Sequence, residues 1–528
     1  MRWVALLFLV FPAQLASQTK PQFRSPALNL LASVAKPLTA NRVYVGVSNA
    51  GYIGAFLSQP GVTWPAPYVQ QLYVFYSGLQ VAGLIPRTAG FTWAGDTVAV
   101  YFADERGDQV NGGPLADVFD SRDSADAARW PQSAIVLDTA VYTPSLIGKP
   151  AVSAQDLWTR YWDRPRLVPG LTHPMGLLVD QRFIGWPYPT GNADVVYMVY
   201  TLYNVTARTP AAYNNPTIPF EQRGEIATEG RAFQDTVEAS LGVQLPDAGY
   251  ALDSVYIGLL VDHDIATFNH NYATASVPFG LAIGYDGHFR DELGWTYPPE
   301  IFGAPPFTPV PGLLGAKFLK APGPFVMFTN FTGGGTFPDP IGAPLLWRRM
   351  SLNLVPSDAQ CNPFTNPAVA RQRHLCTLVQ TQSDSRFQIS AGPFHLGPGE
   401  ATTVILAFLL AAPLDTVNAY VGGDLRPGVP FTGDSIAVDT TKITTIERAA
   451  GWRTQTDLNG DGVIQAAEVT AVRRSLLHKA QVAQAIVDAK FLMAAAPDAP
   501  EFFLIPGDNA VTVVWQPSAT EKSGDPYY

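Results

Sequence analysis

One twelve-residue stretch, Asp457–Glu468, spaces its oxygen-bearing side chains as a ligand set for a hard cation. Calcium takes six to eight oxygen ligands, and a loop of this length supplies them from positions 1, 3, 5, 7, 9 and 12. Gly462 stands at position 6, where the chain must turn sharply, and Ile464 adds an apolar contact at position 8. The ligands predicted for Ca2+ are Asp457, Asn459, Asp461, the backbone carbonyl of Val463, Gln465 through a water molecule, and the bidentate Glu468. The alternative interpretation is a solvated turn of Asp, Asn and Gly that binds no metal.

This stretch resembles an EF-hand loop, because every position of the pattern D-x-[DN]-x-[DN]-G-x5-E is filled. It also resembles half of a dockerin, since Val469, Val472 and Leu476 follow at helical spacing. The dockerin resemblance implies a cohesin partner and a polysaccharide-degrading assembly. Dockerins, however, carry two such repeats and usually place Asp at position 12, whereas this sequence has one repeat and Glu468 there. We therefore predict a structural calcium clamp in preference to a cohesin-binding module.

A weaker candidate, Asp262-His263-Asp264, follows a predicted strand. Two carboxylates and a histidine at a strand end can ligate a metal or transfer protons. The sequence favours the other interpretation, a polar loop tip that satisfies its own backbone. The sequence contains no HExxH, GxSxG, P-loop or GxGxxG motif, so we predict no catalytic residues. The two catalytic carboxylates of a glycoside hydrolase need not lie close together in sequence, so the lack of a motif does not exclude such a pair.

The N-terminus predicts export. Arg2 precedes an apolar run at 3–10 and a small-residue stretch at 13–17, which is the order of a secretory signal peptide. We expect a secreted or cell-surface protein without a transmembrane segment, because no other stretch has the roughly 18 apolar residues that a membrane span needs. In an oxidising compartment Cys361 and Cys376 are expected to form a disulfide. A disulfide that closes a loop of this length stabilises the folded protein by about 3 kcal/mol. Two free buried thiols are the alternative.

The composition favours a globular, strand-rich protein of more than one domain. The chain has 528 residues, of which 47% are apolar and 15% charged, and domains usually run to about 100–200 residues. Its 45 Gly and 46 Pro are scattered, which breaks the chain into short segments joined by turns. The net charge of −10 and the lack of a basic stripe argue against nucleic-acid binding.

Strand patterns predict a mainly β fold with two antiparallel β-sandwich-like modules. Asp194–Val205 is nearly continuous apolar and aromatic, which is typical of a central strand. The turn 397–400 is expected to join Arg386–Ser390 and Thr402–Ala411 as a hairpin, and Glu229–Leu241 to form a short helix. We expect a signal peptide at 1–17, a linker at 18–41, an N-terminal β module at 42–248, a second β-sandwich module at 249–438, a helical EF-hand-like unit with the calcium loop at 439–496, and the start of a further domain at 497–528.

The final segment, 497–528, resembles the first two strands of a fibronectin type III domain. Such sandwiches need seven strands and about 100 residues, so we expect the sequence to be a truncated piece of a longer protein. Together with the stretches around Tyr161-Trp-Asp, His173–Arg182, Ser254–Asp264 and Asp384–Glu400, it resembles a group of uncharacterised bacterial secreted proteins with a fibronectin type III-like C-terminal domain. The resemblance implies export and β modules, and it brings no activity.

These observations predict a non-enzymatic structural or binding role outside the cell, with one structural calcium site and a protein or glycan ligand of unknown identity. The alternative is an extracellular hydrolase or accessory module that acts on a polysaccharide, whose groove the abundant aromatic residues would line. A deep cleft that holds two carboxylates about 5–10 Å apart would favour the hydrolase.

Overall fold

A computed structural model describes the parts of the chain on which the fold and the sites below rest. The described residues are 34–54, 61–66, 71–86, 97–103, 117–162, 175–188, 191–242, 244–266, 268–276, 280–286, 312–332, 343–353, 375–377, 383–411, 435–437, 463–465, 475–492 and 501–517.

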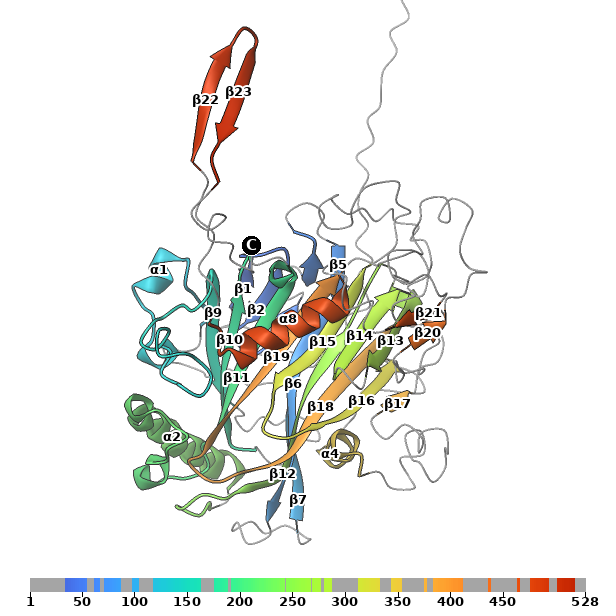
Figure 1. The fold of residues 1–528 in the computed structure, drawn as a ribbon. Helices are drawn as coiled ribbons and strands as arrows, with labels where there is room; N and C mark the ends of the chain where they lie inside the picture. The colour runs from blue at the N-terminus through green and yellow to red at the C-terminus, as the bar shows by residue number, and fades with distance from the viewer. Residues whose placement is uncertain are drawn as a thin grey trace, which may run out of the picture.

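Two large β-sheets dominate these residues, which confirms the predicted mainly β class (Figure 1). The nine-stranded sheet has the order β1-β2-β3-β6-β12-β18-β16-β17, with β7 beside β6, and all its pairs are antiparallel except β16 with β17. Its strands are β1 (Ala35–Leu38), β2 (Val45–Ser48), β3 (Ile53–Gly54), β6 (Tyr76–Pro86), β7 (Thr97–Ala103), β12 (Leu252–Asp262), β16 (Phe325–Thr332), β17 (Leu375–Thr377) and β18 (Ser385–Leu396).

The eight-stranded sheet is antiparallel throughout, in the order β13-β14-β15-β19-β11-β10-β9-β8. Its strands are β8 (Phe119–Asp120), β9 (Gln155–Trp162), β10 (Leu177–Gly185), β11 (Val195–Asn204), β13 (Asn271–Ser276), β14 (Leu281–Asp286), β15 (Leu313–Lys320) and β19 (Ala401–Ala411). The predicted central strand at 194–205 is β11, and it lies in the interior of this sheet.

The boundary expected between 248 and 249 does not separate two sheets. Strand β12 from the second half pairs with β6 from the first, and β19 pairs with β11 in the other sheet. Both halves of the chain therefore contribute to one core between the two large sheets. Alternation of apolar residues indicates which segments are strands and which face is buried, but it does not identify the pairing partner.

The hairpin expected around the turn 397–400 is also different in the structure. Strand β18 pairs with β12 and β16, whereas β19 pairs with β11 and β15. The turn is a corner that leads the chain from one large sheet to the other. Its Gly399 has φ +76, and a Cβ there would lie 2.1 Å from the carbonyl oxygen of Ala212. The tight corner and not a two-stranded ladder explains the Gly-Pro-Gly sequence.

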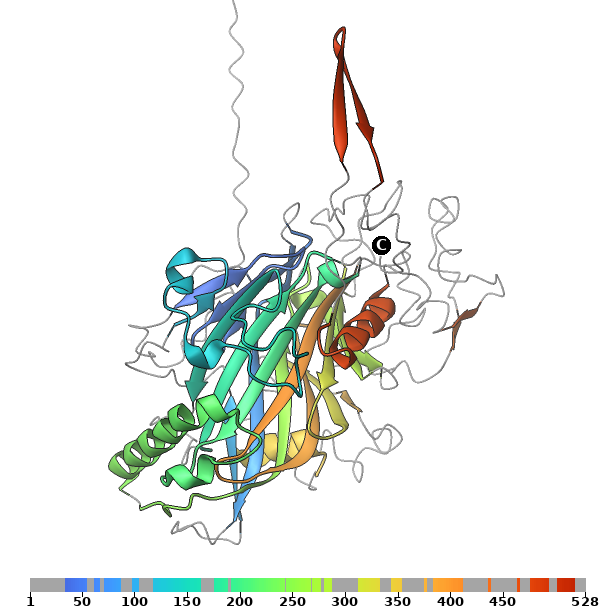
Figure 2. The same ribbon diagram turned by 60° about the vertical axis from the view of Figure 1, so that its left-hand side comes forward.

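Alternation along β11 divides the apolar residues between two layers. Val196, Met198 and Tyr200 belong to the core between the sheets. Val195 and Tyr197 face outward, into a second apolar cluster beneath helix α8 (Leu476–Asp488). Figure 2 shows α8 lying against the outer face of the eight-stranded sheet. This helix falls within the helical unit predicted from the sequence.

The remaining helices and small sheets are peripheral. The helix expected at 229–241 begins earlier, as α2 (Arg223–Leu241), and ends where Gly242 takes φ 65. The others are α1 (Ser124–Ala127), α4 (Ala343–Ser351) and the 3-10 helices η4 (Gln132–Ala134), η5 (Asn192–Asp194), η6 (Pro210–Tyr213), η7 (Phe220–Gln222) and η8 (Phe268–His270). Three two-stranded sheets pair β4 (Val62–Trp64) with β5 (Gln71–Val74), β20 (Ser435–Ala437) with β21 (Val463–Gln465), and β22 (Phe502–Gly507) with β23 (Ala510–Trp515).

The hairpin β22–β23 coincides with the two strands expected after residue 497, and its apolar side chains, such as Phe502 and Trp515, are exposed. No helix in the described part of the chain is long and apolar enough to cross a membrane.

Candidate functional site

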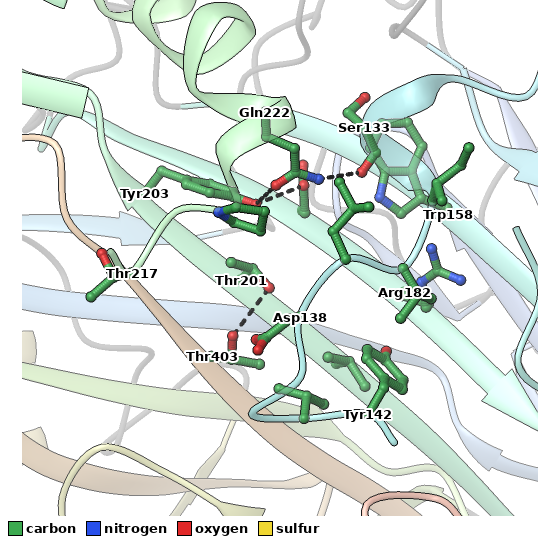
Figure 3. Close-up of a pocket in the computed structure, with 17 residues that line it drawn as sticks. Ser133, Asp138, Tyr142, Trp158, Arg182, Thr201, Tyr203, Thr217, Gln222 and Thr403 are labelled. Carbon is green, nitrogen blue, oxygen red and sulfur yellow. Dashed lines mark hydrogen bonds between the residues drawn. The ribbon is translucent and has the colours of Figure 1, made fainter. Parts of the chain in front are cut away.

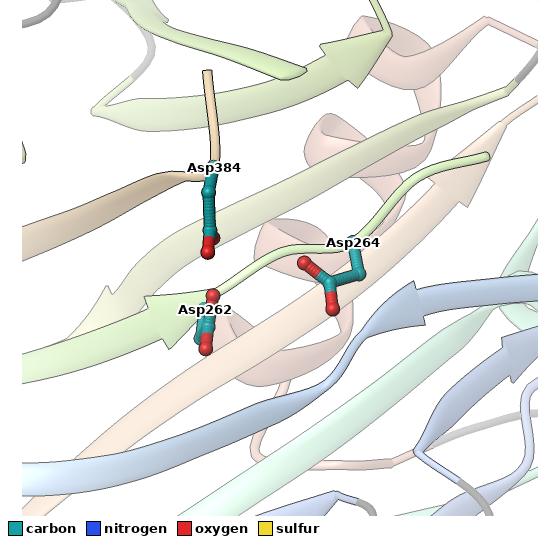
Figure 4. A group of neighbouring side chains, drawn as sticks. All are labelled: Asp262, Asp264 and Asp384. Atoms are coloured by element: carbon teal, nitrogen blue, oxygen red, sulfur yellow. The ribbon is translucent and has the colours of Figure 1, made fainter. Parts of the chain in front are cut away.

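Three aspartates meet at one end of the nine-stranded sheet (Figure 4). Asp262 is the last residue of β12, Asp264 follows two residues later, and Asp384 directly precedes β18. One carboxylate oxygen of each lies within 4.8 Å of the others. Asp262 and Asp264 are buried and Asp384 is half-buried, so the group sits at the edge of the protein interior with one side toward solvent.

The register of the two strands brings these residues together. β12 and β18 are antiparallel, with Asp262 opposite Arg386. Asp264 lies two residues after Asp262, and Asp384 lies two residues before Arg386. Because the strands are antiparallel, both steps lead toward the same end of the sheet. Because side chains two residues apart in an extended chain point to the same face, the three carboxylates gather on one side.

Arg386 provides positive charge beside the group. Its guanidinium pairs with Asp262 at 3.2 Å and lies 5.4 Å from the centroid of the Tyr76 ring, on the neighbouring strand β6. Tyr76 is also opposite Asp262 in the ladder, so ring, guanidinium and carboxylate are fixed by the same three strands. Partial neutralisation by an arginine lowers the repulsion between carboxylates without removing it.

His263 does not join the aspartates, so the combined carboxylate and histidine site considered as a weaker candidate from the sequence does not form. Its side chain points to the opposite face, where the Nε2 atom lies 2.9 Å from the carbonyl oxygen of Tyr272 and the ring packs against Phe387. A Cβ on Gly284 would come within 2.9 Å of the imidazole, so this glycine leaves room for the ring between the two sheets. His263 thus has a packing role, because adjacent residues of a strand face opposite ways.

The chemistry of the group is that of a hard-cation site. Carboxylate oxygens suit Ca2+, Mg2+ and Mn2+, whereas Zn2+ prefers nitrogen and sulfur ligands. Asp262, Asp264 and Asp384 would supply three of the six or more oxygens that such an ion takes, and backbone carbonyls and water would supply the rest.

Most of the calcium loop predicted from the sequence lies outside the described residues, namely Asp457, Asn459, Asp461 and Glu468. Val463 and Gln465 are the ends of β21, and their backbones pair with Ala437 and Ser435. Cys361 also lies outside the described residues, and Cys376 is placed only as part of the backbone of β17. The calcium loop and the disulfide therefore stay predictions.

Sequence reasoning considered Asp262 and Asp264 only as a weaker candidate and missed Asp384 as their neighbour. The signal was present, since Asp384 precedes an apolar strand in the same way that Asp262 ends one. Recognising it required knowing that β12 and β18 pair, and in which register.

Comparisons with known proteins assign no family to the chain. No family model matches it, and a search of curated proteins found no match. Among solved structures, a candidate aldose 1-epimerase from Escherichia coli K12 is similar over 72% of this chain and 99% of that chain, with 11% identity and a TM-score of 0.25. Likeness at this level carries no functional argument.

Proposed function

We propose that the protein has a structural or binding role outside the cell and holds a hard divalent cation, with Ca2+ as the first candidate, at Asp262, Asp264 and Asp384. The observation that carries the cation site is the convergence of three carboxylates, from chain segments that lie far apart in sequence, within 4.8 Å. Export is inferred from the N-terminal sequence.

The position of the group explains what a cation would do there. β12 and β18 are central strands of the nine-stranded sheet, and the aspartates stand where one ends and the other begins. Carboxylates at this separation repel one another when ionised, and a divalent cation turns the repulsion into attraction. Since the unfolded chain does not hold the three groups together, the ion binds the folded state and stabilises it.

Two acidic residues on the eight-stranded sheet are held in ion pairs with arginines. Asp180 accepts hydrogen bonds from Arg160 at 2.5 and 2.8 Å, and Asp156 accepts one from Arg182 at 2.6 Å. Carboxylates engaged in this way maintain structure, whereas a glycoside hydrolase needs a pair that faces its substrate.

The loop at 457–468 is proposed as a second and independent calcium site. It precedes α8 by a few residues, and calcium bound there would order the chain that leads into the helix. The two sites differ in architecture, since one is local in sequence and the other depends on the tertiary fold.

Calcium titration of chelator-treated protein, followed by thermal unfolding, tests the proposal. At a free calcium concentration about a hundred times Kd, one site adds about 2.7 kcal/mol to the free energy of unfolding. We expect Asp264→Asn with Asp384→Asn to abolish the contribution of the three aspartates, and Asp457→Ala with Glu468→Ala to abolish that of the loop. Asp508→Asn, in the exposed turn of the hairpin β22–β23, is the control variant, in which both calcium contributions should be unchanged.

The pattern of responses separates the two sites. If millimolar calcium leaves the unfolding temperature of the loop variant unchanged, the site at the three aspartates is refuted. If the response of the wild-type protein survives in the Asp264 and Asp384 variant at full size, the cation binds elsewhere and the assignment of these residues fails.

A further inference from the structure

A pocket opens on the outer face of the eight-stranded sheet (Figure 3), and none of the three aspartates lines it. The cavity has a volume of about 70 Å³ and is open to solvent on one side. Strands β9, β10, β11 and β19 form its floor, the loop that carries Asp138 and Tyr142 forms one wall, and the segment from Thr217 to Gln222 forms another.

The floor is polar because outward-facing residues of four neighbouring strands fall in register. Arg160 is opposite Asp180, Asp180 is opposite Thr201, and Thr201 is opposite Thr403. Arg160 also pairs with Glu225 of α2 at 2.7 Å. The charged groups of this row are held by one another, so the floor is rigid.

The next row of the floor is charge-balanced in the same way. Arg182, opposite Trp158, pairs with Asp156 at 2.6 Å and donates to the carbonyl oxygens of Pro150 and Ala134. Neither arginine is left with its charge unpaired, which disfavours an anionic ligand in the pocket.

Two hydrogen-bond donors that line the pocket have no partner among the described residues. No hydrogen bond to the described part of the chain uses the indole N–H of Trp158 or the hydroxyl of Tyr142. Burial raises the pKa of Tyr142, so its hydroxyl keeps the proton that it can donate. Unsatisfied buried polar groups are costly, and a bound ligand or ordered water satisfies them.

Acceptors lie on the same pocket. Asp138 is half-buried, and its Oδ1 atom accepts the backbone N–H of Ala140 at 2.7 Å, which leaves its other oxygen available. The hydroxyls of Thr201 and Thr403, 3.3 Å apart, each donate or accept. The aromatic rings of Tyr142 and Trp158 add apolar surface to these polar groups.

We infer that this pocket binds a neutral, polyhydroxylated ligand of the size of one sugar unit. Each hydroxyl of such a ligand both donates and accepts, which matches the donors at Trp158 and Tyr142 together with the acceptor at Asp138. The ring carbons would pack on the aromatic side chains. This inference deepens the binding role proposed above and rests on it, but it does not require the cation.

Saturation-transfer NMR with D-glucose, D-galactose, D-mannose, D-xylose and myo-inositol as probes tests the inference, with a chelator present so that the cation site plays no part. We expect at least one probe to bind with a millimolar or lower Kd. Asp138→Asn should weaken this binding by about tenfold or more, since hydrogen bonds to a charged group are the stronger ones. Trp158→Phe, which keeps an aromatic ring of smaller size and removes the N–H, should weaken it by about fivefold.

The hairpin β22–β23 supplies matched controls. Asp508→Asn and Trp515→Phe make the same chemical changes away from the pocket and should leave Kd unchanged, and thermal unfolding shows that all four variants are folded. Binding of none of the five probes overturns the inference, as does binding that only D-glucuronate or an alkylammonium ion achieves. An equal Kd for the pocket variants and the controls overturns it too, because the ligand would then bind elsewhere.

Discussion

Replacing Lys479 by methionine is expected to weaken the attachment of helix α8 to the sheet that it covers. The Lys479 ammonium is buried beneath the helix, 2.7 Å from Asp194 and 2.7 Å from the carbonyl oxygen of Leu410 in β19. Methionine has a similar length and no charge, so the substitution keeps the packing and removes the ion pair.

The size of the effect follows from what Asp194 retains. Removal of one partner from a buried ion pair costs about 3–5 kcal/mol, because the other charge stays buried. Asp194 still accepts hydrogen bonds from Arg42 at 2.7 and 2.6 Å and from the Trp64 indole at 2.8 Å. These contacts offset part of the loss, so we expect the free energy of unfolding to fall by about 3 kcal/mol, at the lower end of that range.

The pH dependence of stability provides a second readout. Burial would raise the pKa of Asp194, but the charges of Lys479 and Arg42 outweigh it and hold this pKa below its ordinary value. A carboxyl whose folded pKa lies below its unfolded value of about 3.9 contributes stability above that pH and loses it as the pH falls through the folded pKa. In Lys479→Met the folded pKa rises, so acid unfolding should begin at a higher pH.

Urea unfolding followed by tryptophan fluorescence measures the free energy, and hydrogen exchange of residues 476–488 shows whether the helix detaches alone. Lys490→Met is the matched control, because the Lys490 ammonium donates to Thr139 at the exposed surface, and its loss should cost less than about 1 kcal/mol. If Lys479→Met changes stability no more than the control, and exchange in α8 stays at the wild-type rate, the ion pair does not anchor the helix.

Two further predictions concern packing. Gly176→Ala should lower the free energy of unfolding by about 2–3 kcal/mol, because a Cβ there would lie 2.4 Å from the Thr206 methyl. Gly148→Ala is the control: it has the same φ of +80 and nothing within 4 Å of the added Cβ, so it should cost only about 1 kcal/mol of backbone strain. The difference between the two variants in urea unfolding measures the cost of the clash. Phe491→Ala should lower the free energy of unfolding by about 3–5 kcal/mol, because its ring contacts Tyr142, Trp186 and Tyr197. The neighbouring Leu492 side chain is 63% exposed, so Leu492→Ala should change thermal stability by less than about 0.5 kcal/mol. Equal effects of the two substitutions would contradict the packing described.

The parts of the fold that depend on local pattern could be predicted from the sequence. The apolar run of β11, the strands β22 and β23, and the helical character around α2 and α8 each follow from neighbouring residues. Local sequence carries the periodicity of 2 or 3.6 residues that separates strands from helices.

The pairings between distant strands could not be predicted in this way. The residues of the turn 397–400 predict a hairpin, but the turn joins strands of different sheets. Turn residues determine a change of chain direction and do not determine which strands form hydrogen bonds with each other. The three aspartates and the row from Arg160 to Thr403 depend on the same long-range registers. The cluster of aspartates and the polar row both form only because distant strands pair in a particular register.

The contacts of α8 also connect the helix with the pocket. Phe491, just beyond the helix, stacks on Tyr142 with ring centroids 5.6 Å apart, and Tyr142 lines the pocket wall. Lys490 donates to Thr139 in the same loop, next to Asp138. A change that detaches α8 therefore removes two supports of the wall that carries the acceptor of the proposed ligand. If the loop at 457–468 binds calcium and orders the start of α8, the same contacts transmit that effect to the pocket, and coupling between the two sites would then be reciprocal.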